Sequence, residues 1–122
     1  MKKVWILEKF ETHEEMVKHH ADYEEWLEDA KANDPNYVGH LETLVVKHKE
    51  MMDANPDGRW YGFDGKSKYN QFCEYAKVSL RCNPHAKFRV IEAEIEDDAT
   101  NWLGYKFVKE NEGVLRYLMA TK

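Results

Sequence analysis

The densest group of residues that could do chemistry lies in one glycine-rich segment, residues 59–68. It contains three cations and three aromatic side chains, namely Arg59, Trp60, Tyr61, Phe63, Lys66 and Lys68. Cations beside flat rings on a flexible loop can bind an anionic ring system such as a nucleotide, through charge and stacking. The helix expected to begin near Ser67 would direct its N-terminal N–H groups toward the same anion. The segment is therefore a candidate ligand-binding loop.

The same segment also has a purely structural interpretation. Trp60 and Phe63 could fill the core beneath the loop while the lysines are solvated, since large aromatic side chains are more often buried than exposed. A Walker-type phosphate loop is excluded, because four residues must separate its two glycines and Trp60 occupies the position of the first. Ligand binding and core packing both remain open for residues 59–68.

A second group of interest is the acidic run after position 91. Alternate side chains of a strand share one face at a spacing of roughly 7 Å, and four acids have this alternation: Glu92, Glu94, Glu96 and Asp98. Such a ridge could mimic nucleic acid and occupy the basic groove of a protein partner. A solvated sheet face would show the same pattern. The ridge is a candidate partner-binding surface.

No spacing indicates a catalytic or metal site. The six histidines include no His-Glu-x-x-His pair, and Cys73 and Cys82 lack the second cysteine pair of a zinc site. Neither of the two serines, Ser67 and Ser79, stands in a Gly-x-Ser-x-Gly elbow. Cys73 falls on the apolar face of a predicted helix, where a thiol is usually inert. We therefore expect no catalytic residue, no metal and no cofactor, and an enzyme whose site assembles only in space stays an alternative.

Composition narrows the class of protein. The 122 residues are the usual size of a single domain, and a hydrophobic fraction of 43% supplies a core without disulfide or metal staples. The net charge of -5 disfavours general nucleic-acid binding and permits a basic protein partner. The chain contains neither a signal-peptide core nor an apolar run that could span a bilayer. We expect one globular domain over 1–122, in the cytoplasm, with free thiols and no membrane contact.

The hydrophobic pattern predicts an α+β fold of order β-α-α-α-β-β-β, a mostly antiparallel four-stranded sheet with about three helices. The predicted helices are residues 12–33, 38–54 and 67–80, of which the first two form an antiparallel pair. The predicted strands are residues 4–10, 87–95, 102–109 and 114–119, and a hairpin turn at 110–113 joins the last two. Residues 102–109 also allow a helix, but the adjoining turn favours a strand.

The sequence thus predicts a small non-enzymatic binding protein that inhibits or sequesters a protein partner. This composition, without catalytic motifs, is typical of an accessory protein of a bacterium or a phage. The alternatives are a binder of a nucleotide or another small anionic ligand through residues 59–68, and a small enzyme. A homo-oligomer is compatible with each of them.

Overall fold

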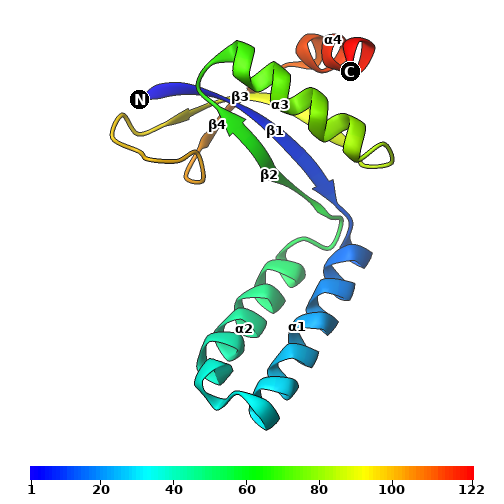
Figure 1. The fold of residues 1–122 in the computed structure, drawn as a ribbon, viewed down its shortest axis with the longest axis vertical. Coiled ribbons are helices and arrows are strands. Elements are labelled where there is room, and N and C mark those ends of the chain that lie inside the picture. The colour runs from blue at the N-terminus through cyan, green and yellow to red at the C-terminus, as the bar shows by residue number, and fades with distance from the viewer. The chain divides into compact units, whose positions relative to one another are not determined.

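A computed structural model describes residues 1–122 and shows an α+β fold, as predicted (Figure 1). Its elements are β1 (Lys2–Glu11), α1 (His13–Asn33), the short 3-10 helix η1 (Pro35–Tyr37), α2 (Val38–Ala54), β2 (Arg59–Lys66), α3 (Tyr69–Cys82), β3 (Phe88–Ile95), β4 (Lys106–Glu110) and α4 (Glu112–Thr121). Contacts along the chain divide it into two compact units. The first comprises Met1–Phe10 and Trp60–Lys122, and the second comprises Glu11–Arg59.

The first unit contains a four-stranded sheet in the order β2-β1-β3-β4. β1 and β3 pair antiparallel, and so do β3 and β4, with an irregularity between Glu92 and Ala93. β1 has a neighbour on each side, as its two-sided apolar pattern predicts. Val4, Ile6 and Leu7 of this strand are all buried.

The sheet buries apolar side chains on both faces, because successive residues of a strand point to opposite sides. Residues of α3 and α4 pack on one face, in a cluster of Leu7, Phe72, Cys73, Ala76, Leu80, Phe88, Val90 and Leu118. The opposite face carries a smaller cluster of Val4, Ile6, Ile91, Ala93 and Ile95. Ala99, Trp102 and Tyr105 pack against this second cluster, so the segment 96–105 covers part of that face.

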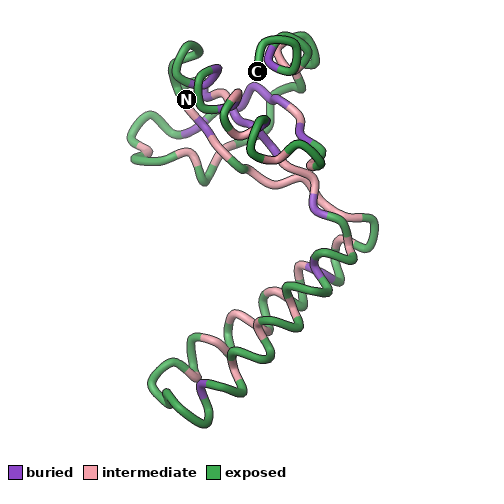
Figure 2. The backbone as a smooth tube through the Cα atoms, turned by 45° about the vertical axis from the view of Figure 1, so that its right-hand side comes forward, coloured by how far each residue is buried: buried purple, intermediate pink, exposed green.

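The second unit is a helical hairpin made of α1, η1 and α2. The two long helices lie side by side, which confirms the predicted antiparallel pair (Figure 1). The hydroxyl of Thr12 accepts a hydrogen bond from the Glu15 N–H at 3.2 Å and caps α1. Most residues of the hairpin are exposed or half-buried (Figure 2), and its buried apolar residues are Met16, Ala30 and Met52. None of the helices in the chain has both the length and the apolar composition that crossing a bilayer requires.

Three predictions about elements need correction. Residues 59–66, predicted as a loop, form β2. Residues 114–119, predicted as a strand, belong to α4, whose first turn is capped by the Asn111 side chain through a 3.1 Å hydrogen bond from the Val114 N–H. In the ambiguous segment 102–109, the strand begins only at Lys106. The observed order is β-α-α-β-α-β-β-α, and the sheet keeps four strands because β2 takes the place of the strand predicted at the C-terminus.

Candidate functional site

A hollow of about 330 Å³ opens in the first unit beside the N-terminus of α3. Residues of β1, β2, α3 and the segment 96–105 line it. The lining includes groups suited to a polar or aromatic ligand, on Lys2, Lys66, Ser67, Lys68, Asn101 and Trp102. Its lining contains three lysines and no acidic residue, although the chain carries a net charge of -5. Such a cleft concentrates positive potential in a protein whose surface is otherwise acidic.

The first turn of α3 adds to this potential. α3 begins at Tyr69, and no side chain caps it at the N-cap residue Lys68. The first N–H groups of a helix have no partner within the helix and carry partial positive charge. Because Ser67, Lys68 and Gln71 all line the hollow, this helix end borders it. The arrangement suits an anion.

The three lysines differ in how far their charge is already compensated. Lys66 donates a hydrogen bond to Asp64 at 2.8 Å, and its ammonium lies 4.6 Å from the centre of the Tyr75 ring. Lys2 and Lys68 are exposed, and neither forms an ion pair. The charge that is free to meet a ligand therefore comes mainly from Lys2 and Lys68.

Trp102 forms an aromatic wall of the hollow and packs directly on two glycines of β2. A Cβ atom at Gly62 would lie 2.5 Å from the Trp102 ring, and one at Gly65 would lie 2.6 Å from it and 2.7 Å from the Ile6 side chain. Neither glycine could become alanine unless Trp102 moved, so both are needed for the close approach of this ring. The indole is thereby fixed as a flat surface on which a ring could stack.

A buried polar network fastens the segment 96–105 to the sheet. Glu8 is only 4% exposed, and its carboxylate accepts two hydrogen bonds. Arg89 donates to its Oε1 at 2.6 Å, and the Tyr105 hydroxyl donates to its other oxygen. Burial and the bond to Glu8 raise the pKa of Tyr105 well above its ordinary value, so the phenol stays protonated. This network helps to fix the segment that carries Asn101 and Trp102.

Of the six residues predicted from the sequence to bind a ligand, the structure brings Lys66 and Lys68 to the hollow. The other four do not line it. Trp60 packs edge-on against Phe10, with 5.3 Å between the ring centres, and the Arg89 guanidinium lies 4.7 Å from its ring centre. It is half-buried, which agrees with the packing interpretation of this side chain.

Phe63 and Tyr61 are the two remaining aromatic residues of the predicted set. Phe63 packs edge-on against the buried Phe88 ring at 5.4 Å, although 36% of its surface stays exposed. Tyr61 is half-buried within β2. Because alternate residues of a strand point to opposite faces, a strand cannot gather all its aromatic rings around one ligand as a loop could.

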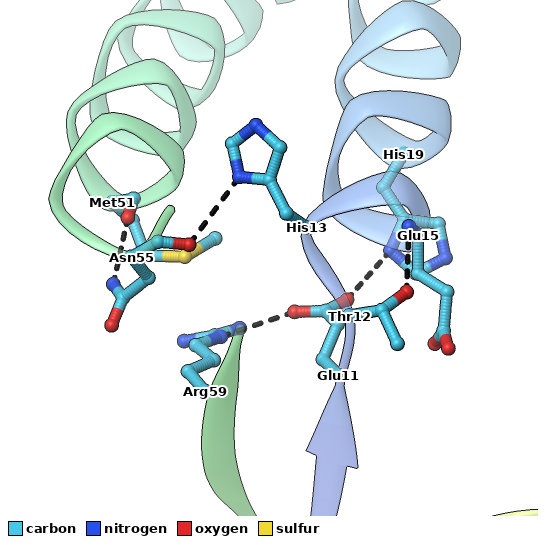
Figure 3. A network of polar contacts seen from close by, with 8 residues as sticks. All are labelled: Glu11, Thr12, His13, Glu15, His19, Met51, Asn55 and Arg59. Atoms are coloured by element: carbon cyan, nitrogen blue, oxygen red, sulfur yellow. Dashed lines mark hydrogen bonds and ion pairs between the residues drawn. The ribbon is translucent and has the colours of Figure 1, made fainter. Parts of the chain in front are cut away.

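Arg59 belongs to the second unit, at the base of the helical hairpin (Figure 3). Its Nε donates a hydrogen bond to Oε1 of the buried Glu11 at 3.1 Å, and Nδ1 of His19 lies 2.9 Å from the other oxygen of the same carboxylate. His13 Nδ1 lies 3.3 Å from the backbone oxygen of Asn55, on the other side of the hairpin base. Arg59 thus has an ionic partner within the hairpin.

The acidic ridge is not a uniform surface. Glu92 is 9% exposed, and its carboxylate lies 2.5 Å from the Lys3 ammonium and 3.4 Å from that of Lys109. It also accepts a 3.1 Å hydrogen bond from the side-chain amide of Asn111. The bond from Lys3, followed by that from Asn111, lowers the pKa of Glu92 against the opposing effect of burial.

The other three acids of the ridge, Glu94, Glu96 and Asp98, are exposed. β3 ends at Ile95, so only Glu94 continues the strand alternation from Glu92. Glu96 lies 4.0 Å from Lys106 at the surface, and such exposed pairs contribute little to stability. The regular spacing expected for a nucleic-acid mimic therefore ends with the strand.

Lys2, Asn101 and Trp102 were not identified as site residues by sequence reasoning. They come from opposite ends of the chain, and they meet α3 only because β1 pairs with β3 and the segment 96–105 folds back on the sheet. No local spacing carries that information. Elsewhere in the chain, no group of three or more His, Cys, Asp or Glu side chains is arranged to hold a metal ion.

Comparison with known proteins gives no information about the function of the hollow, so its function is inferred from the residues that line it. The chain matches no protein-family model, no curated protein and no solved structure.

Proposed function

We propose that this chain is a non-enzymatic binding protein that holds a small anionic ligand of the nucleotide class in the hollow beside α3. The observation that carries the proposal is the convergence of Lys2, Lys66 and Lys68 on one hollow that no acidic residue lines. Clustered cations repel each other, and an anion between them relieves that repulsion. Because acidic residues outnumber basic ones over the whole chain, a hollow lined by lysines and by no acidic residue stands out as a positively charged site.

The parts of the hollow match the parts of a nucleotide. A phosphate can accept hydrogen bonds from the uncapped first turn of α3 and can pair with the ammonium groups of Lys2 and Lys68. A base can stack on the fixed Trp102 ring, and the Asn101 amide offers a donor and an acceptor beside it. A volume of about 330 Å³ lies at the small end of ligand pockets, which favours a single nucleotide over a polymer.

Isothermal titration of the full chain with ADP, inorganic phosphate and adenosine tests this proposal. ADP should bind more tightly than phosphate, because it adds stacking to charge, and adenosine should bind most weakly. Lys68→Ala and Lys2→Ala should each weaken ADP binding by about tenfold, the effect of losing one charge-assisted contact. Rising salt should weaken it further.

Lys122→Ala is the matched control, since Lys122 is exposed in the same unit and does not line the hollow. It should bind ADP as the parent chain does. If no member of the ligand series binds, the proposal is wrong. Equal losses for Lys122→Ala and Lys68→Ala would likewise reject it, because they would reflect net charge and not a site.

Inhibition or sequestration of a basic protein partner stays a prediction. The structure leaves Glu94, Glu96 and Asp98 exposed for that role, whereas Glu92 is already engaged by Lys3 and Lys109. The hollow supports the small-ligand function more directly, because folding brings Lys2 to the neighbouring pair Lys66 and Lys68 in a cleft that no acidic residue lines.

A further inference from the structure

Two histidines face each other across the seam of the helical hairpin. His20 of α1 and His48 of α2 place their Nδ1 atoms 3.2 Å apart. Their rings are nearly parallel, at 11°, with 5.3 Å between the centres. The side chain of His20 is only 13% exposed, and its Nε2 lies 3.0 Å from a carboxylate oxygen of Glu24. Both ring nitrogens of His20 therefore have a defined partner.

This geometry limits the number of protons that the pair can hold. A contact between two nitrogens at hydrogen-bond distance needs one N–H and one lone pair. With both rings neutral, His20 donates from Nε2 to Glu24 and accepts at Nδ1 from His48. If His20 gains a proton, it donates from both nitrogens and His48 becomes the acceptor. If both rings are protonated, two N–H groups and two positive charges face each other, and the contact is lost.

The groups around His48 come from several segments of the second unit. The His48 and Tyr23 rings pack perpendicular to each other, with 4.8 Å between ring centres and 88° between ring planes. Burial and the neighbouring His20 lower the pKa of His48 below its ordinary value of 6.5. Glu11 opposes that effect, and His19 and Arg59 add to it. On balance, these surroundings disfavour protonation of His48 in the closed hairpin.

We infer that the His20–His48 contact is a proton-sensitive joint, which holds α1 against α2 until the pair takes up its second proton. Beyond this contact the hairpin has a small core, because Met16, Ala30 and Met52 are its only buried apolar residues. The rest of the seam is made of half-buried apolar side chains such as Leu27, Leu44 and Met51, so a polar contact that is lost in acid should weaken the pairing of the two helices. Uptake of the second proton opens the seam.

The sign of the effect follows from linkage. A histidine whose pKa is lower in the closed hairpin binds more protons when the hairpin opens, so acid favours opening. The stabilisation is complete above the ordinary histidine value of 6.5 and is lost as the pH falls below it. Between about pH 7.5 and pH 5, one proton of this kind can change the opening equilibrium by at most about 30-fold.

Amide hydrogen exchange of the full chain, corrected for the intrinsic pH dependence of exchange, measures this opening directly. Protection of the α1 and α2 amides should fall by about tenfold between about pH 7.5 and pH 5, while β3 amides serve as the internal reference. His48→Gln keeps a polar side chain at the seam but cannot be protonated, so it should abolish the pH dependence. His40→Gln, at an exposed position of α2, is the matched control and should behave as the parent chain does.

Two results would overturn the inference: protection of α1 and α2 that does not change across this pH range, or His48→Gln that retains the parent pH dependence. If His48→Gln does not fold, imidazole nitrogen NMR of the parent chain decides. Loss of α1 and α2 protection must then coincide with protonation of His48. A hairpin that stays protected with both imidazoles protonated would refute the joint.

Discussion

Trp60 is the residue at which the ligand-binding and packing interpretations of the sequence make opposite predictions. The structure places it against Phe10 and beneath the Arg89 guanidinium, away from the hollow. Trp60→Ala should therefore lower the free energy of unfolding by roughly 3 kcal/mol, as truncation of a packed aromatic does. Affinity for ADP should stay unchanged. Urea unfolding measures the stability of this variant, and titration measures its affinity for ADP. A variant that lost affinity but not stability would show that Trp60 contacts the ligand.

Glu92 makes the strongest residue-scale prediction about the acidic ridge. Glu92→Lys would place a third ammonium beside Lys3 and Lys109 and remove the acceptor for Asn111. Placing a cation where this mostly buried carboxylate had bonded two exposed lysines should lower the free energy of unfolding by roughly 2 kcal/mol. The double change Glu94→Lys with Glu96→Lys is the control, since both are exposed and surface changes stay within about 0.5 kcal/mol. Equal stability of the two variants in urea would contradict a structural role for Glu92.

The lowered pKa of Glu92 also sets the direction of its pH dependence. A carboxyl whose pKa is lower in the folded chain contributes stability above its ordinary value of 4.5 and loses it as the pH falls through the folded value. The stability difference between Glu92→Gln and the parent chain should therefore shrink in acid.

At the scale of elements, the sequence predicted a helix correctly where a helical pattern was present and no strand pattern competed with it. The helix 38–54 was predicted with its observed bounds, because apolar residues recur at helical spacing between Pro35 and Pro56. Cys73 was correctly placed on the apolar face of α3, where Phe72, Ala76 and Leu80 are also buried. These elements depend on periodicity and on proline, which are both local signals.

The incorrect elements are those in which tertiary contacts outweigh the local pattern. The glycines of residues 59–66 suggested a loop. These residues form an edge strand instead, and Gly62 and Gly65 leave room for the Trp102 ring to pack against that strand. Val114, Leu115 and Leu118 fit a strand about as well as a helix when taken alone. Packing of Leu118, Val114 and Leu115 on α3 and the sheet selects the helix. The residue spacing within each segment gives no information about which other part of the chain packs against it.

At the scale of the whole molecule, the chain should fold without a metal or a disulfide. The first unit has buried clusters on both faces of its sheet, and Cys73 and Cys82 are free, one buried and one exposed. Treatment with EDTA, and separately with a reductant, should leave the melting temperature unchanged in differential scanning calorimetry. A fall of several degrees with either reagent would show that a metal or a disulfide supports the fold.

The two units also differ in what they offer to function. The first has the larger core and carries the hollow, whereas the second is a hairpin with few buried residues. Local stability follows buried apolar contacts, so the hairpin should be the more easily opened unit. The proposed ligand binding and the proposed proton sensitivity are therefore assigned to different units.

Backbone NMR of the full chain titrated with ADP tests the central claim most directly, since it reports where the ligand binds as well as whether it does. We expect the largest shift changes at the amides of Ser67 to Gln71, which lead into and begin α3, and at the indole N–H of Trp102, with the Trp60 indole unmoved. Inorganic phosphate should move the α3 amides but not the Trp102 indole, because it has no ring to stack. Shift changes confined to residues outside the hollow, or none at millimolar ADP, would contradict the assignment of the hollow as an anion-binding site.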